Sequence, residues 1–424
     1  MKVFLRTFGC RANHYDTEAV RELVESNGHS IVSSVESADV AVFNSCAVTT
    51  DAEAELRKVV RRAAKDRPGL RSVVMGCAAA LDDNRPAHLS IRALPTVDRV
   101  VASADLTELA GALELNHVHS RILTRSQSGT RALIRIQDGC DEHCTFCATT
   151  MARGANRSRP ADDIVREATA LAEHHREIVI TGIHIGTYGK DIGSSLGQLM
   201  SRLVREVGAT RFRLTSIEAT EIDPQLSELI ADPATDLVPH IHAPLQSGAD
   251  RLLKRMGRHW YTSGSYAMSI ETLAKGCRWL GLGADIITGF PGETAEDHAA
   301  TVALVEQLPF TYLHVFPFSL RPGTSAERLP SRVAPAVADD RARELRSIGD
   351  RKAGAYSATR VGSTADVIAI GLPRDDGREG LTEDYLTVRL RDASIARGDR
   401  FQAKLEGNAA CLEATRDVSA CAMV

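Results

Sequence analysis

The 424-residue sequence predicts an α/β protein in three parts: a small parallel α/β domain, a partial (βα)6 barrel and a small β-barrel. Three observations support this. Short apolar strands alternate with helical stretches up to about residue 125, and a strand–helix rhythm returns up to about residue 355. Strand-like segments without intervening helices fill the remainder. We expect domains at residues 1–125, 130–355 and 358–424.

In the first part, residues 40–43 and 72–75 have the apolar character of strands, and residues 16–26 and 52–65 that of helices. Cys10, Cys46 and Cys77 each follow a strand or a strand-like start. Carboxyl ends of parallel strands lie side by side, so these cysteines can converge at one edge of the sheet. Three isolated cysteines are otherwise more often buried small side chains than a shared metal site.

The polar stretch 124–130 predicts a linker into the second part. The strands expected after it are residues 132–136, 177–181, 211–215, 240–242, 284–288 and 312–317. Helical stretches at 162–174, 195–206 and 294–307 lie between them. This alternation is typical of a parallel βα barrel, which carries its chemistry at the C-terminal ends of the strands.

The third part begins after a charged helix expected at residues 336–353. Residues 365–370 and 385–390 have strand character, and the turn-rich residues 373–377 separate them. A small β-barrel is the simplest fold for such a segment.

The composition limits which classes of function are possible. No apolar run is long enough to span a bilayer, and nine cysteines without a secretory signal indicate reduced thiols or metal ligands, so we expect a cytoplasmic protein without a membrane partner. The net charge of −4 does not decide for or against nucleic acid. Residues 57–71 are strongly basic, which fits either a phosphate-binding face or a solvated helix face.

The strongest motif is Cys140-Asp-Glu-His-Cys144-Thr-Phe-Cys147, directly after the first barrel strand. Three thiolates at CxxxCxxC spacing can ligate three irons of a cubane cluster and leave the fourth iron open. The alternative is a zinc site, which needs a fourth ligand such as His143.

This motif, with Phe146 before the last cysteine, resembles that of the radical S-adenosylmethionine superfamily. The resemblance implies that the open iron chelates S-adenosylmethionine and that reduction of the [4Fe-4S] cluster cleaves the cofactor to a 5′-deoxyadenosyl radical. It also implies cofactor contacts at polar and glycine positions after the barrel strands. These candidates are Thr181, Gly182, Ser216, Glu218, Gln246, Ser247 and Gly289.

The sequences around Cys10, Cys46 and Cys77 resemble the three cysteine motifs of the radical S-adenosylmethionine methylthiotransferase family. The resemblance covers nearly the whole chain. It implies a second [4Fe-4S] cluster on these three cysteines and a TRAM-like C-terminal barrel that binds RNA. The family's Arg-Gly…Arg-Ser-Arg element is similar to a stretch whose arginines are candidates for contacting phosphate or the cofactor. They are Arg153, Arg157 and Arg159.

Within this family, the stretches at residues 10–13, 216–218 and 380–386 resemble the branch that adds a methylthio group to carbon 2 of N6-threonylcarbamoyladenosine in tRNA. The partners implied are tRNA and a reduced flavodoxin- or ferredoxin-type electron donor. Alternatives are methylthiolation of isopentenyladenosine in tRNA or of an aspartate in a small-subunit ribosomal protein. A further alternative is a non-catalytic metal- and RNA-binding protein.

Overall fold

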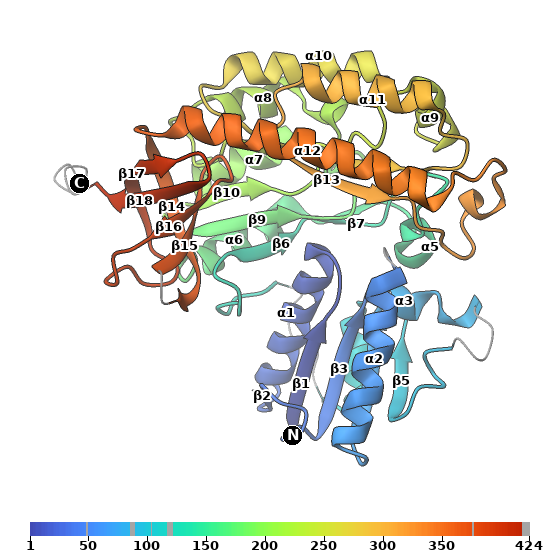
Figure 1. Ribbon diagram of the computed structural model, residues 1–424. Helices are drawn as coiled ribbons and strands as arrows, with labels where there is room; N and C mark the ends of the chain where they lie inside the picture. The colour runs from blue at the N-terminus through green and yellow to red at the C-terminus, as the bar shows by residue number, and fades with distance from the viewer. Residues whose placement is uncertain (48–49, 85–89, 103, 117–121, 375–376, 418–424) are drawn as a thin grey trace.

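The computed structural model describes residues 1–424 except 48–49, 85–89, 103, 117–121, 375–376 and 418–424. Three sheet systems follow one another along the chain (Figure 1): a five-stranded parallel sheet, an open barrel of parallel strands and a closed antiparallel-rich barrel. They confirm the predicted α/β class with its three kinds of sheet. Among the described helices, none combines the length and the apolar character that a bilayer span requires.

The N-terminal sheet has the strand order β2-β1-β3-β4-β5, all parallel. Its strands are β1 (Lys2–Thr7), β2 (Ser30–Val32), β3 (Val40–Ser45), β4 (Arg71–Gly76) and β5 (Val97–Val101). Side chains alternate across it, so Val40 and Val42 pack with helices α1 (Arg11–Ser26) and α4 (Leu106–Ala112). Ala41 and Phe43 pack on the other face, against α2 (Thr50–Asp66). The short helix α3 (Cys77–Ala80) follows β4 directly.

The open barrel consists of two three-stranded parallel sheets, β10-β9-β6 and β11-β12-β13. Isolated parallel bridges, Phe212 to Leu237 and Ser216 to His242, join them into one curved wall. The strands are β6 (Ala132–Arg135), β9 (Glu177–Thr181), β10 (Arg211–Leu214), β11 (His240–His242), β12 (Gly281–Thr288) and β13 (Tyr312–Pro317). This arrangement confirms the predicted partial barrel of six parallel strands.

Helices cover the outside of the barrel (Figure 1). They are α6 (Ala161–Ala172), α7 (Leu196–Glu206), α8 (Pro224–Ala231), α9 (Asp250–Arg255), α10 (Ser263–Gly276), α11 (Ala295–Gln307) and α12 (Pro335–Arg360). Ile178 and Ile180 of β9 share a core with Leu171 of α6. Since side chains alternate along a strand, Val179 and Thr181 face the lumen.

The C-terminal barrel is closed, with the order β14-β15-β16-β18-β17. Its strands are β14 (Thr364–Arg374), β15 (Gly377–Thr382), β16 (Thr387–Leu390), β17 (Arg400–Asn408) and β18 (Cys411–Arg416). It docks on the open barrel through buried guanidiniums: Arg211 donates to the Leu381 carbonyl at 3.0 Å and Arg213 to the Thr382 carbonyl at 3.0 Å. The Tyr385 ring then stacks on His240 of β11, with centroids 4.3 Å apart.

The expected element types are confirmed, and the differences lie at the ends. Helix α1 begins at Arg11 rather than residue 16, because Ala12 and Tyr15 of its first turns are buried and favour continuing the helix up to Cys10. Helix α12 continues to Arg360, whose guanidinium is fully buried and paired with Asp384. Part of the expected turn at 373–377 lies outside the described residues.

Candidate functional site

Cys10, Cys46 and Cys77 lie at the C-terminal ends of the three neighbouring strands β1, β3 and β4. Cys10 Sγ and Cys77 Sγ each lie 3.9 Å from the same atom, Oδ1 of Asn13. Any side chain at Gly9, where φ is +93°, would overlap the sulfur of Cys46, so a glycine there leaves room for that thiol. The three thiols therefore converge at one edge of the sheet.

This edge faces the barrel and receives a cation from it. Arg153 ends helix α5 (Thr149–Arg153), and its Nε lies 3.2 Å from Cys77 Sγ. Burial raises the pKa of the Cys77 thiol to about 11, so its loading with metal releases a proton. A guanidinium beside converging thiols suits a cluster held by anionic thiolates.

Cys140, Cys144 and Cys147 lie on the loop between β7 (Gln137–Asp138) and α5, and all three are partly exposed. The backbone N–H of Cys147 donates to the Cys144 carbonyl at 3.1 Å, which curls the loop. The N–H of Thr145 donates to the Met256 carbonyl at 2.8 Å and fixes the loop on the segment after α9.

Two cations flank this second triplet. Nη1 of Arg258 lies 3.6 Å from Cys144 Sγ, and Nδ1 of His184 lies 3.5 Å from Cys140 Sγ. Burial alone would lower the pKa of His184, but the hydrogen bonds with Cys140 and Glu221 raise it to about 10. The Arg258 guanidinium and the His184 imidazolium therefore offset the negative charge that three thiolates bring.

Arg258 also pairs with the predicted cofactor residue Glu218. Both side chains are buried, and Glu218 Oε2 has no hydrogen-bond partner in the described part of the chain. A buried carboxylate oxygen without a donor is costly. An ammonium or hydroxyl group of a bound cofactor would satisfy it, which is the property expected of a site for S-adenosylmethionine.

Thr181 and Gly182 precede a loop that Gln137 joins to the Cys140 loop. Gln137 Oε1 accepts from the N–H groups of Ile183 at 3.0 Å and His184 at 2.8 Å, and its Nε2 donates to the Gly139 carbonyl at 2.6 Å. Thr181 itself is buried at the end of β9. The loop after β9 is thus held directly beside the cysteine loop.

Ser216 and Gln246 lie at the strand ends around Glu218. Ser216 is exposed and bridges to His242 of β11. Gln246 is 9% exposed and has φ of +62°. A non-glycine residue in this conformation stores strain and is typical of a functional site.

Ser247 and Gly289 have structural partners. The Ser247 hydroxyl accepts from the Ala249 N–H at 3.1 Å and lies 3.3 Å from the Thr301 hydroxyl. A side chain at Gly289, where φ is +72°, would overlap Ala338 of α12. The close approach that Gly289 permits in this structure is therefore to a helix of the protein.

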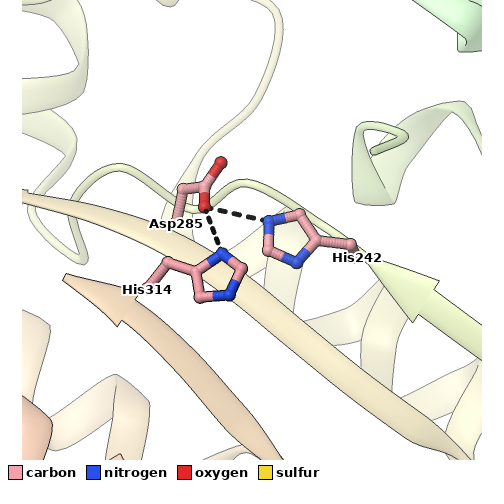
Figure 2. A group of neighbouring side chains, drawn as sticks. All are labelled: His242, Asp285 and His314. Atoms are coloured by element: carbon pink, nitrogen blue, oxygen red, sulfur yellow. Dashed lines mark hydrogen bonds and ion pairs between the residues drawn. The ribbon is translucent and has the colours of Figure 1, made fainter. Parts of the chain in front are cut away.

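Thiol spacing separates the two kinds of metal site. A single zinc ion needs sulfurs about 3.8 Å apart. Among the described residues, the group whose three ligand atoms all lie within 4.8 Å is His242, Asp285 and His314, and neither cysteine triplet is so closely packed. Neither triplet is therefore arranged here as a closed zinc site. In the compact group, Asp285 Oδ1 lies 3.0 Å from His242 Nε2 and 3.3 Å from His314 Nδ1 (Figure 2).

Two of the three arginines predicted to contact RNA or cofactor hold the domains together here. Arg153 is 6% exposed and pairs with Asp16 at 2.8 Å and Asp138 at 3.0 Å. Arg159 pairs with Glu167 at 2.6 Å and donates to the Tyr15 hydroxyl at 2.9 Å. Arg157, in contrast, is 63% exposed.

Replacing Arg153 with alanine should lower the free energy of unfolding by about 3 kcal/mol, because the buried carboxylate of Asp16 loses a partner. Urea titration measures this. Arg157→Ala is the control and should change stability by less than about 0.5 kcal/mol. Equal stability of the two variants would contradict the interdomain role of Arg153.

Sequence reasoning missed four residues of this site: Asn13, Gln137, His184 and Arg258. Each lies close in sequence to a predicted feature, since Asn13 follows Cys10 by one helical turn and Gln137 follows the first barrel strand. Each also contacts a partner 32 or more residues away in sequence, such as Ser45 for Asn13 and Cys144 for Arg258, which no local pattern reveals.

The family comparisons agree with these sites. Residues 2–98 match the family described as Uncharacterized protein family UPF0004, and residues 134–305 match the Radical SAM superfamily. In structure, the chain resembles TsrM, a radical S-adenosylmethionine methyltransferase from Kitasatospora setae, with a TM-score of 0.56 and 14% identity over 77% of each chain. That likeness supports the fold.

The sequence relatives are closer. Threonylcarbamoyladenosine tRNA methylthiotransferase MtaB of Bacillus subtilis is 34% identical over 95% of this chain and 93% of its own. MtaB of Rickettsia prowazekii is 33% identical over 95% and 94%. The tRNA-2-methylthio-N(6)-dimethylallyladenosine synthase of Sorangium cellulosum is 32% identical over 89% and 83%. The chain belongs to the radical S-adenosylmethionine methylthiotransferase family and is MtaB-like.

Proposed function

We propose that the protein adds a methylthio group to carbon 2 of N6-threonylcarbamoyladenosine in tRNA. One observation carries the proposal: helix α5 begins two residues after Cys147 and ends at Arg153, which contacts Cys77. The two cysteine triplets are therefore neighbours across one interface. A reaction that needs a radical source and a sulfur donor at the same carbon atom requires such proximity.

In this proposal, Cys140, Cys144 and Cys147 hold one [4Fe-4S] cluster and Cys10, Cys46 and Cys77 hold the other. When bound, these clusters and S-adenosylmethionine supply the radical that removes the carbon-2 hydrogen and the methylated sulfur that replaces it. Arg258, His184 and Arg153 balance the charge of the thiolates. Thr181, Gly182, Ser216, Glu218 and Gln246 orient S-adenosylmethionine. Ser247 and Gly289 stabilise the same loops through contacts with other parts of the protein.

In this proposal, the three parts of the chain have different roles. Residues 1–125 carry the sulfur-donor site, residues 130–355 the radical site, and residues 358–424 bind RNA. Arg157 is the exposed candidate for a phosphate contact, while Arg153 and Arg159 fix the parts relative to each other. The partners are tRNA and a reduced flavodoxin- or ferredoxin-type electron donor, which places the reaction in the cytoplasm.

Nucleoside mass spectrometry of tRNA from a deletion strain tests the proposal. The methylthio form of N6-threonylcarbamoyladenosine should disappear and its unmethylthiolated precursor should accumulate. The anaerobically reconstituted protein should hold about eight irons per chain. Loss of methylthio-isopentenyladenosine instead would favour the activity named for the Sorangium relative, and unchanged tRNA would contradict the proposal.

A further inference from the structure

The barrel lumen contains a polar wall that neither cysteine triplet uses. Arg11 Nη2 donates to the Tyr385 hydroxyl at 3.1 Å, and the Tyr385 ring lies 5.5 Å from the Tyr312 ring. The Tyr312 hydroxyl lies 3.1 Å from His242 Nδ1, and His242 belongs to the group drawn in Figure 2. All three parts of the chain thus contribute to one continuous surface, the lumen wall.

Arg11 differs from the other arginines of the lumen. Arg213 and Arg258 are buried and paired with carboxylates, whereas the Arg11 guanidinium has a single hydrogen bond, to a tyrosine, within the described chain. The carboxylate of Glu177 is already paired with Arg131, Arg211 and Arg213, and that of Asp366 with Arg211, so neither is paired with Arg11. A half-buried guanidinium without a counterion in such surroundings favours an anionic ligand.

A cavity lies at Arg11. Its volume is about 290 Å³, and it is lined by Arg11, Gly129, Thr130, Arg131, Leu133, Val179 and Ile370. Leu133 of β6 and Val179 of β9 are register partners and provide an apolar side. The cavity therefore combines two guanidiniums with aliphatic surface.

The group His242, Asp285 and His314 does not cancel this preference for anions. Burial raises the pKa of Asp285, but its hydrogen bonds with His242 and His314 outweigh burial and lower it. Both imidazoles contact the same oxygen, Oδ1, and the second oxygen points away from both rings (Figure 2). Asp285 therefore stays ionised, but it does not line the cavity at Arg11.

We infer that the lumen wall binds the threonylcarbamoyl substituent of the substrate adenosine, with the Arg11 guanidinium receiving its carboxylate. This inference rests on the proposed function. The substituent carries a carboxylate and a methyl group, which match the Arg11 guanidinium and the aliphatic side of the cavity. A substituent without a carboxylate leaves Arg11 unpaired, so Arg11 also determines specificity.

Two synthetic anticodon stem-loops test the inference, one with N6-threonylcarbamoyladenosine and one with its methyl ester. Fluorescence anisotropy gives their dissociation constants with preparations matched for iron content. The wild-type protein should bind the acid about 10- to 100-fold more tightly than the ester. In Arg11→Gln this ratio should fall to about one, and Arg11→Lys should retain part of it, because lysine keeps the charge but loses the planar fork.

Arg21→Gln is the matched control, because Arg21 lies on the same helix α1 and pairs with Glu18. It should leave the acid-to-ester ratio unchanged. An unchanged ratio in Arg11→Gln, or equal binding of the two RNAs by the wild type, would overturn the inference. A wild-type protein that does not methylthiolate the acid stem-loop would instead defeat the proposed function.

Discussion

Replacing Cys140 with alanine should abolish the formation of 5′-deoxyadenosine from S-adenosylmethionine. Cys140 is one of only three thiols on the β7–α5 loop and the one that contacts His184, so its loss leaves two thiols for the proposed cluster. Losing a residue that hydrogen-bonds to a metal ligand commonly lowers metal affinity or activity 10- to 100-fold. Losing a ligand itself should therefore lower 5′-deoxyadenosine formation at least about 100-fold. Liquid chromatography of an anaerobic reaction with dithionite measures the product.

Cys277→Ala is the matched control. Its sulfur packs against the Ile230 carbonyl at 3.9 Å, and Cys277 belongs to neither triplet. This variant should form 5′-deoxyadenosine at the wild-type rate. If Cys140→Ala protein also kept that rate, the assignment of the radical site to the β7–α5 loop would be wrong.

Replacing Cys46 with alanine should separate the two halves of the chemistry. Cys46 is buried at the end of β3, in the N-terminal sheet, and the β7–α5 loop is untouched by its removal. We expect 5′-deoxyadenosine formation to stay within about twofold of wild type, since the changed residue is outside that ligand set. No methylthiolated nucleoside should form, because the sulfur-donor site lacks a ligand.

Iron analysis and nucleoside mass spectrometry of the same preparation measure both effects. The Cys46→Ala protein should hold about half the iron of the wild type. Methylthiolated tRNA made by this variant would refute the sulfur-donor role of the N-terminal triplet. Loss of 5′-deoxyadenosine as well would show that the two sites depend on each other, contrary to the separation expected here.

Much of the fold follows from local sequence pattern. Residues 177–181 and 240–242 are strands with the limits expected, and the run from Ile178 to Thr181 is apolar or β-branched, as is typical of strands. The start of α1 was less predictable, because the early turns that carry it back to Arg11 are buried against other parts of the chain, which a local window does not contain.

The functional site, like the fold, was predicted only in part from the sequence. The three strand ends predicted to bring Cys10, Cys46 and Cys77 together do so, since parallel strands align their carboxyl ends. The arginine element was identified, but Arg153 lies in a buried ion pair with Asp16, 137 residues away, and Arg159 pairs with Glu167 and donates to the distant Tyr15 hydroxyl. A basic residue in a sequence does not reveal whether a phosphate or a carboxylate will face it.

The sequence by itself determined the order of the three sheets and the Cys140–Cys147 motif, because strand and helix periodicity and thiol spacing are local properties. The resemblance to known motifs added the N-terminal triplet and the family. Only the tertiary structure decided which groups surround the thiols and what lines the lumen. Arg11 meets Tyr385 across 374 residues of chain, and Arg153 meets Cys77 across 76. Such contacts exist only after the three parts dock, because docking sets which charges face each other in a low-dielectric interior.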